Sequence, residues 1–211
     1  MALGTLNLAL HHEHLLLGTT PKERYPFILM ELIVATGTTK SNAAISLAPI
    51  VLEGLKGEQA CVLLQVHAHP RDAKMLEEEC VTIVRHALFE SDGESWHRLD
   101  GALKEINGLF KGFLASGSVS DIHAIISFVD REQSIHLSQA GRGEGYLVRN
   151  GVASQVTEVT KGKTVPMFIH IASGELEAGD TIILGCIPCS TCAAGIAPHR
   201  GLARTHRAVG S

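Results

Sequence analysis

The stretch from Ile122 to Thr157 constrains the fold of this chain most, because it predicts two consecutive β-hairpins. The first hairpin begins with Ile122–Val129, which is rich in β-branched residues, and turns at the polar segment Asp130–Gln133. It returns through Ser134–Ala140, where apolar and polar residues alternate. Because this alternation makes one face of the strand apolar, one side of the predicted β-meander must be covered.

The second hairpin is predicted by the turn pair Asn150-Gly151. Both residues tolerate the positive φ angles of a two-residue type I′ turn, whose twist matches that of the strands it joins. The flanking segments, Tyr146–Arg149 and Val152–Thr157, have the composition of strands, and the glycine-rich segment Gly141–Gly145 connects the two hairpins.

Composition narrows the classes of function. With 211 residues, 45% of them hydrophobic, the chain can bury the core of one domain, and its formal charge of −4 gives no basic field for nucleic acid. No apolar run reaches the roughly 20 residues of a membrane helix, and Met1–Leu10 lacks the basic start of a signal peptide. Five cysteines, three of them near the C-terminus, do not make a disulfide framework. The sequence therefore predicts a cytoplasmic protein with no nucleic-acid or membrane partner, and leaves open an unknown protein partner.

The other predicted elements alternate between strands and helices. Apolar residues at helical spacing predict helices over Arg71–Glu90 and Ser95–Ala115, and another over Ala43–Lys56 that Pro49 would kink. Strands are expected over Leu6–Leu17, the buried run Pro26–Ala35, Met167–Ile171 and Thr181–Leu184, whereas Gln59–Val66 fits either a strand or a helix. Residues 1–185 form the predicted domain, and residues 186–211, rich in Cys, Gly and Arg, form a tail expected to be disordered.

Two histidine pairs have the spacing of candidate metal ligands. His12 with His14, and His67 with His69, would project from one face of a strand, and imidazole suits zinc. We favour the alternative of half-exposed strand histidines, because neither pair has a third ligand placed beside it. The lone Glu31, within an apolar run, is likewise assigned a structural role.

The second half of the chain resembles the metal-dependent protein phosphatases of the PPM, or type 2C, family. Ile135–Gly151 is similar to the family's hairpin around Gly-Asp-Ser-Arg-Ala-Tyr, and Gln155-Val-Thr157 to the Gln-Leu-Thr that follows it. Ser116-Gly-Ser118 resembles the stretch leading into a core strand, and Leu176–Leu184 resembles the family's Gly-Asp strand. The similarity extends from Pro26 to Leu184 and implies an α+β fold: an αββα sandwich of two antiparallel β-sheets flanked by helices.

The resemblance also locates the acidic positions of the family, and the chain departs from them. In the family, aspartates at the ends of central strands hold two Mg²⁺ or Mn²⁺ ions that activate water for attack on a phosphomonoester. Here Thr36-Gly37 stands where the first Asp-Gly is expected, and Arg142 replaces the aspartate of the Gly-Asp-Ser turn. Gly185–Cys189 follows Leu184 in place of Ser-Asp-Gly, while Asp180 matches a residue that closes a turn.

These departures predict a degenerate, non-catalytic phosphatase-like domain, a pseudophosphatase with a binding or regulatory role and no cofactor. Arg142, between Gly141 and Gly143, is the candidate anion-binding site, because guanidinium pairs with phosphate and carboxylate. A solvated turn arginine is the alternative for that position. The enzyme alternative is a weakly active Mg/Mn-dependent serine/threonine phosphatase whose metal site is rebuilt from Glu31, Asp121 or histidines.

The tail supplies a further hypothesis. Cys186, Cys189 and Cys192, with His199 beyond them, have the spacing of zinc ligands. Zinc knuckles normally pair two separated Cys-x2-Cys units, whereas here three cysteines run together. A loose tail that binds no metal is therefore the alternative.

Overall fold

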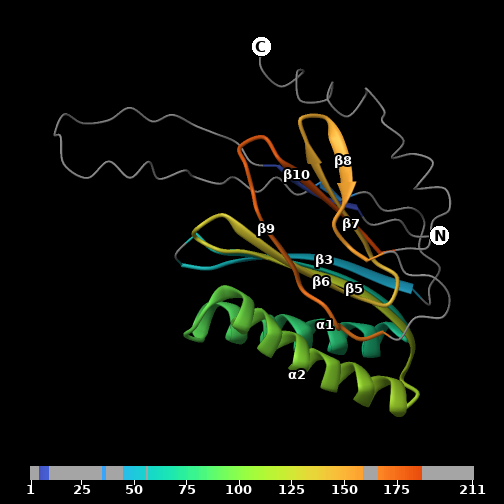
Figure 1. Cartoon of the computed structure of the whole chain (residues 1–211). Helices are drawn as coiled ribbons and strands as arrows, with labels where there is room; N and C mark the ends of the chain where they lie inside the picture. Colours follow the sequence, from blue (N-terminus) through green and yellow to red (C-terminus); the bar gives the residue numbers. More distant parts are fainter. Residues whose placement is uncertain (1–4, 10–34, 37–44, 56, 159–165, 187–211) are drawn as a thin grey trace, which may run out of the picture.

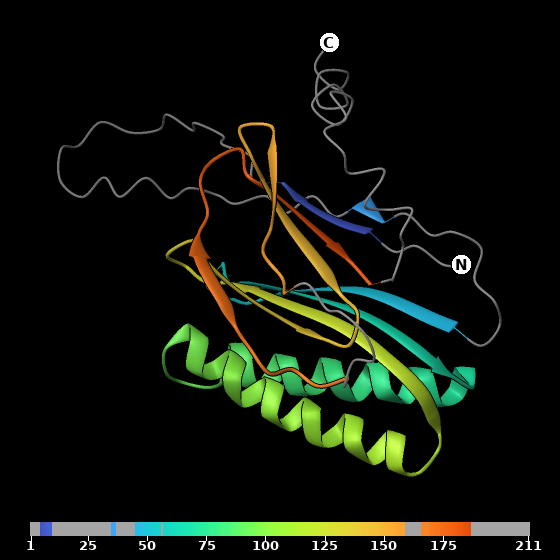
Figure 2. The same cartoon turned by 45° about the vertical axis from the view of Figure 1, so that its right-hand side comes forward.

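Two stacked β-sheets and a layer of helices make up the molecule (Figures 1 and 2). The computed structural model describes residues 5–9, 35–36, 45–55, 57–158 and 166–186. In this part of the chain both sheets are antiparallel with five strands each, and the helices cover the outer face of one sheet. Three layers of the predicted α+β sandwich therefore lie within the described residues.

Sheet B lies between the helices and the other sheet, and its strand order is β3-β4-β5-β6-β9. Its strands are β3 (Ile45–Glu53), β4 (Gln59–Ala68), β5 (Val119–Val129), β6 (Ser134–Ala140) and β9 (Ala172–Glu175). The β5–β6 hairpin confirms the first hairpin predicted from the sequence.

Sheet A has the order β2-β1-β10-β7-β8. Its strands are β1 (Thr5–Ala9), β2 (Ala35–Thr36), β7 (Glu144–Arg149), β8 (Val152–Gln155) and β10 (Thr181–Gly185). The β7–β8 hairpin is the second predicted hairpin, and φ angles of 52° at Asn150 and 77° at Gly151 agree with the expected type I′ turn.

The two hairpins do not form one meander, which corrects the sequence-based expectation. The first belongs to sheet B and the second to sheet A. The segment Gly141-Arg142-Gly143 carries the chain from one sheet to the other, so the hairpins lie in different layers of the sandwich.

The helical layer consists of α1 (Pro70–Arg85), the π-helical turn η1 (His86–Glu90) and α2 (Ser95–Ala115). Proline suits the first position of α1 because its missing N–H would have no partner there, and the His69 side chain caps this end by accepting from the Arg71 amide at 3.3 Å. The sequence predicted α2 with the same bounds, and it predicted α1 and η1 together as one helix. No helix of the described part is long and apolar enough to cross a membrane.

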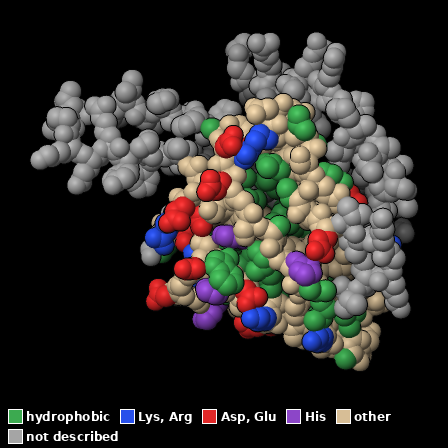
Figure 3. Space-filling view, viewed as in Figure 1, with side chains coloured by type: hydrophobic (Ala, Val, Ile, Leu, Met, Phe, Trp, Pro, Cys, Tyr) green, Lys and Arg blue, Asp and Glu red, His purple; other side chains and the backbone are tan. Residues whose placement is uncertain are grey.

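The core has two parts. The helices pack on sheet B around large, fully buried side chains that include Leu76, Leu99, Ile106, Phe110 and Phe128. The sheets pack on each other around a smaller cluster, in which Leu63, Ile125 and Leu137 of sheet B meet Ile182 and Leu184 of β10. On the face shown in Figure 3, hydrophobic side chains are visible in the middle and charged side chains lie around them.

Two predicted elements are wrong in type or position. Residues 45–53 of the predicted helix over Ala43–Lys56 form β3, an edge strand in which Pro49 is tolerated because an edge can spare a backbone donor. The strand predicted over Met167–Ile171 begins only at Ala172, because the Phe168 backbone pairs instead with the Asn107 side chain, with N–H···Oδ1 and Nδ2–H···O distances of 2.8 Å.

Further predicted segments are described by the structure completely, in part or not at all. Gln59–Val66, which fitted a strand or a helix, lies within β4, an interior strand of sheet B. Of the predicted buried strand Pro26–Ala35, only Ala35 is described, in the two-residue strand β2. The rest of that run, Glu31 included, lies outside the described residues, as do His12 and His14.

Candidate functional site

The candidate site lies at one end of the sheet B face that looks toward sheet A. Four polar residues form two cross-strand pairs there: Gln65 of β4 is opposite His123 of β5, and His67 is opposite Asp121. They share this face with Leu63 and other members of the inter-sheet cluster, because alternate residues of a strand point to the same side. The apolar interior between the sheets therefore ends in a polar group of side chains.

His123 is buried, and its hydrogen bonds define which ring nitrogen carries the proton. Its Nδ1 atom accepts from the backbone N–H of Arg142 at 3.1 Å, so the proton of the neutral ring is on Nε2, which lies 3.3 Å from Asp121 Oδ2. Burial lowers the pKa of His123 below its usual value, Asp121 raises it, and His67 and Arg142 lower it further. His123 is therefore a neutral acceptor at neutral pH.

Gln65 and His67 extend this polar group. The Nε2 atoms of the two side chains are 3.1 Å apart, and the rings of His67 and His123 meet edge to face with centroids 6.1 Å apart. The Gln65 Oε1 atom is buried without a hydrogen-bond partner among the described residues. Buried polar atoms of this kind are ordinarily satisfied by an ordered water.

The crossing segment Gly141-Arg142-Gly143 lies directly against β5. Gly141 has φ +70°, and a Cβ atom added to it would be 2.5 Å from His123 Nδ1 and 2.6 Å from the Ile122 carbonyl oxygen. A Cβ atom on Gly143 would be 2.5 Å from Ile125 Cγ1. Only glycine permits this close approach, so both glycines are buried while Arg142 is exposed between them.

This geometry refines the predicted anion site. The Arg142 amide already donates to His123 and is not free for a ligand. Gly141 and Gly143 shape the turn, and the exposed Arg142 guanidinium is the group of this segment that can meet an anion.

The described donor set does not fit a pair of hard divalent ions. Asp121 is the one carboxylate of the polar group, its side chain is 50% exposed, and it already faces His123. Mg²⁺ and Mn²⁺ sites need several carboxylate or carbonyl oxygens, and neutral imidazoles do not replace that charge. Among the described residues, no group of three or more His, Cys, Asp or Glu side chains is placed to hold a metal ion.

Asp180 has the turn-closing position that the resemblance implied. Its N–H donates to the Glu177 carbonyl at 3.0 Å, and its Oδ2 accepts from the Glu177 amide at 2.8 Å. Arg149 of β7 donates to both carboxylate oxygens, at 3.0 and 2.6 Å. Burial raises the pKa of Asp180, but the hydrogen bonds from Arg149 and Glu177 outweigh it, so the pKa lies below its usual value.

The remaining predicted ligands do not converge on this site. His67 lies in the polar group while its predicted partner His69 caps α1, so the two are separated in role. Cys186 is buried in the inter-sheet cluster, where its S–H donates to the Leu63 carbonyl at 3.5 Å, and burial raises the pKa of its thiol. Cys186 thus packs with the domain, and Cys189, Cys192 and His199 lie outside the described residues. The zinc hypothesis stays a prediction.

Gln65 and His123 were not predicted from the sequence as site residues. Neither stands in a motif, and both enter the site through the β4–β5 register and the crossing segment. The strand alternation of Ile122–Val129 was the available signal, since it places His123 on the same face as Ile125.

Of the comparisons with known proteins, the comparison with solved structures finds similar folds. No protein-family model and no curated protein matches the sequence. Among solved structures, a serine/threonine phosphatase from S. agalactiae superposes with a TM-score of 0.51 at 17% identity, over 69% of this chain and 74% of that one. A stage II sporulation E family protein from Thermanaerovibrio acidaminovorans gives 0.44 at 13% identity, over 65% of this chain and 77% of that one. The Mycobacterium tuberculosis phosphatase PstP gives 0.45 at 14% identity, over 66% and 77%. A further PstP structure is in complex with two manganese ions.

This chain therefore has the fold of the PPM-type phosphatases. The fold implied by the resemblance, which rests on segments between Ser116 and Leu184, is confirmed, and so is the α+β fold class.

Proposed function

We propose that this chain is a phosphatase-like domain that binds a ligand and does not hydrolyse phosphoesters. The observation that carries the proposal is the Arg142 turn. By the sequence resemblance, a metal-supporting aspartate belongs at this position, and here a cation stands there with its backbone held by a neutral histidine. A guanidinium repels divalent cations at close range, so the substitution opposes the charge that the two-metal chemistry needs.

The ligand that suits this site is an anion. The exposed guanidinium of Arg142 can form two parallel hydrogen bonds with a phosphate or with a carboxylate of a protein partner. The half-buried ring of His67 and the free Gln65 oxygen lie on the same inner face of sheet B. Of these two groups the half-buried His67 ring can offer a polar contact to the remainder of such a ligand.

A phosphatase assay separates this proposal from the weakly active enzyme. The full chain is incubated with p-nitrophenyl phosphate and Mn²⁺, with and without EDTA, beside the variant Asp121→Asn. We expect no turnover above the protein-free blank in any sample. Turnover that EDTA abolishes would overturn the proposal, and its loss in Asp121→Asn would place Asp121 in a rebuilt metal site.

A further inference from the structure

A groove separates the outer surfaces of the two helices, on the opposite side of sheet B from the Arg142 turn. Its volume is about 550 Å³, which is within the range of ligand-binding sites in proteins. One wall follows a single face of α1 and η1, where Glu79, Ile83, His86 and Glu90 recur at helical spacing. The facing wall comes from α2.

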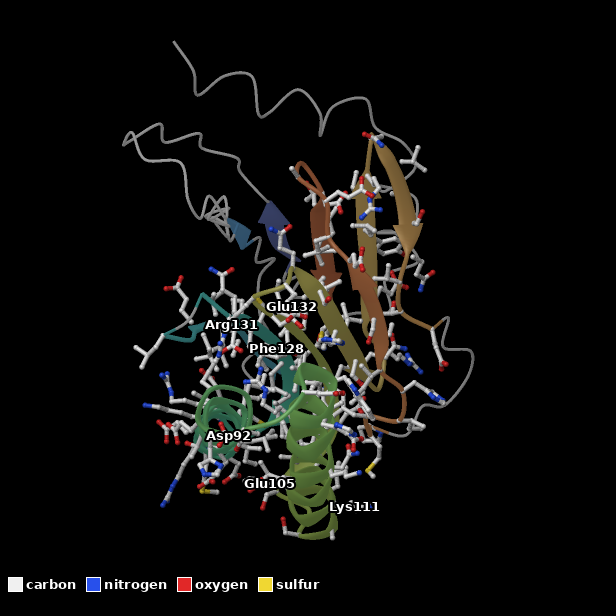
Figure 4. All side chains as sticks on the ribbon, turned by 60° about the vertical axis from the view of Figure 1, so that its left-hand side comes forward. Asp92, Glu105, Lys111, Phe128, Arg131 and Glu132 are labelled. Carbon is white, nitrogen blue, oxygen red and sulfur yellow. The ribbon has the colours of Figure 1, made fainter. Side chains whose placement is uncertain are left out.

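The groove has an apolar floor and an acidic border. Val81, Ile83 and Leu109 are at least partly buried among its lining residues, whereas Glu79, Glu90 and Glu105 are exposed. Figure 4 shows Glu105 on the side of α2 that faces α1, and Lys111 on the opposite side. Lys111, a basic residue of α2, therefore lies away from the groove, whereas the acidic Glu105 lies beside it.

The three border carboxylates outnumber the cations of the groove. Among the residues that the structure describes, none of Glu79, Glu90 and Glu105 forms an ion pair. Two other carboxylates on these helices do form ion pairs, since Glu78 pairs with Lys74 at 3.6 Å and the partly exposed Asp100 pairs with Lys104 at 2.5 Å. The groove itself contains one guanidinium, that of Arg85, and the ring of His86.

The π-helical turn helps to build this border. Its first and last residues, His86 and Glu90, both line the groove. Arg98 of α2 donates to the Leu88 carbonyl inside the turn and to Glu58 Oε1 at 2.8 Å, and so ties the turn to α2 and to the β3–β4 connection. The acidic border is therefore presented on an anchored backbone.

We propose that this groove docks a basic segment of a partner protein, whose Lys or Arg stems lie on the apolar floor and whose charged ends meet the three carboxylates. Charge complementarity selects this partner. Long basic side chains combine an aliphatic stem with a terminal cation, which matches a floor of Val81, Ile83 and Leu109 bordered by glutamates. An acidic or a purely apolar segment would leave the carboxylates without a partner.

The test uses the full chain and a labelled synthetic helical peptide of leucine, lysine and arginine, followed by fluorescence anisotropy. A peptide with glutamate in place of the basic residues serves as the negative probe. The groove variant E79Q/E90Q/E105Q removes three charges with little change of shape. The matched control E78Q/E94Q/D100N removes three charges from the same helical layer outside the groove.

We expect the basic peptide to bind the wild type, to bind the groove variant at least tenfold more weakly, and to bind the control variant within twofold of the wild type. Higher salt should weaken the wild-type complex because the contacts are exposed. No binding to the wild type, or equal losses in both triple variants, would overturn the proposal. A wild-type dimer that dissociates only in the groove variant, seen by sedimentation, would also overturn it by making a second copy the occupant.

Discussion

The His123 Nδ1 atom accepts a hydrogen bond from the Arg142 backbone N–H at 3.1 Å, and this bond holds the crossing segment against β5. The acceptor exists only while His123 is neutral. Protonation would put a second donor opposite the amide, so the geometry of the turn depends on pH.

We therefore predict an acid-induced loss of stability. The folded-state pKa of His123 lies below 6.5, so below that pH the unfolded chain binds a proton that the folded chain resists. Stability is unaffected by this group above about pH 6.5, and falls with decreasing pH until the folded pKa is reached, with a slope of at most about 1.4 kcal/mol per pH unit. Urea unfolding between pH 5 and 8 measures this change in the free energy of unfolding.

The variant His123→Asn is the control for this prediction. Its side-chain oxygen can accept from the Arg142 amide but does not titrate. The free energy of unfolding should therefore fall less steeply with decreasing pH than in the wild type, while the other histidines contribute equally to both proteins. Identical slopes would show that His123 does not cause the pH dependence.

The close approach of Gly141 to β5 predicts a large cost for a small substitution. Gly141→Ala combines strain at φ +70° with a Cβ atom 2.5 Å from His123 Nδ1, and should destabilise by about 2 kcal/mol or more. Gly151→Ala is the matched control, since its φ is +77° with nothing within 4 Å, and should cost about 1 kcal/mol. Chemical unfolding of both variants separates backbone strain from the clash. Equal losses would contradict the close packing of the crossing segment.

The β-hairpins and α2 could be predicted because their signals are local. Asn150-Gly151 specifies a turn by its φ angles, and residues at helical spacing specify α2 regardless of the rest of the chain. The strand around Pro49 could not be predicted, because its apolar residues fit one face of a helix as well as an edge strand. The partner strand β4 decides this case, and its pairing is a long-range contact.

The candidate site was predictable only in part. Arg142 and its flanking glycines stand in a recognisable hairpin motif, so the resemblance located them. His123 and Gln65 depend on the register of two strands and on the change of sheet between the hairpins, which no local pattern records.

The buried pair of Glu58 and Arg98 predicts strong coupling between the β3–β4 connection and α2. Both side chains are at least nine-tenths buried, with an Nη2 to Oε1 distance of 2.8 Å, and the guanidinium lies 5.1 Å from the centre of the Phe128 ring. Arg98→Met leaves a buried carboxylate with only the more distant Arg131, at 3.5 Å, and should cost about 3 kcal/mol. Thermal and urea unfolding measure the loss.

A double variant tests whether the pair itself is responsible. In Glu58→Gln/Arg98→Met the uncompensated charge is gone, so part of the stability lost in Arg98→Met should return. If the stability losses of Arg98→Met and of the single variant Glu58→Gln simply add in the double variant, the pair is not coupled and the prediction is wrong.

The anion site predicts that phosphate binding depends on the Arg142 side chain. Isothermal titration of the full chain with phosphate should show binding that weakens at least fivefold in Arg142→Ala, because the guanidinium is the exposed cation of the crossing segment. Arg71→Ala removes an exposed arginine at the start of α1 and should change the affinity less than twofold. Mn²⁺ titrated into the wild type should give no micromolar binding, because the described donors include a single half-exposed carboxylate. Equal phosphate affinities for the wild type and Arg142→Ala would eliminate the Arg142 turn as the anion site, whereas tight Mn²⁺ binding would restore the metal-dependent enzyme as the better hypothesis.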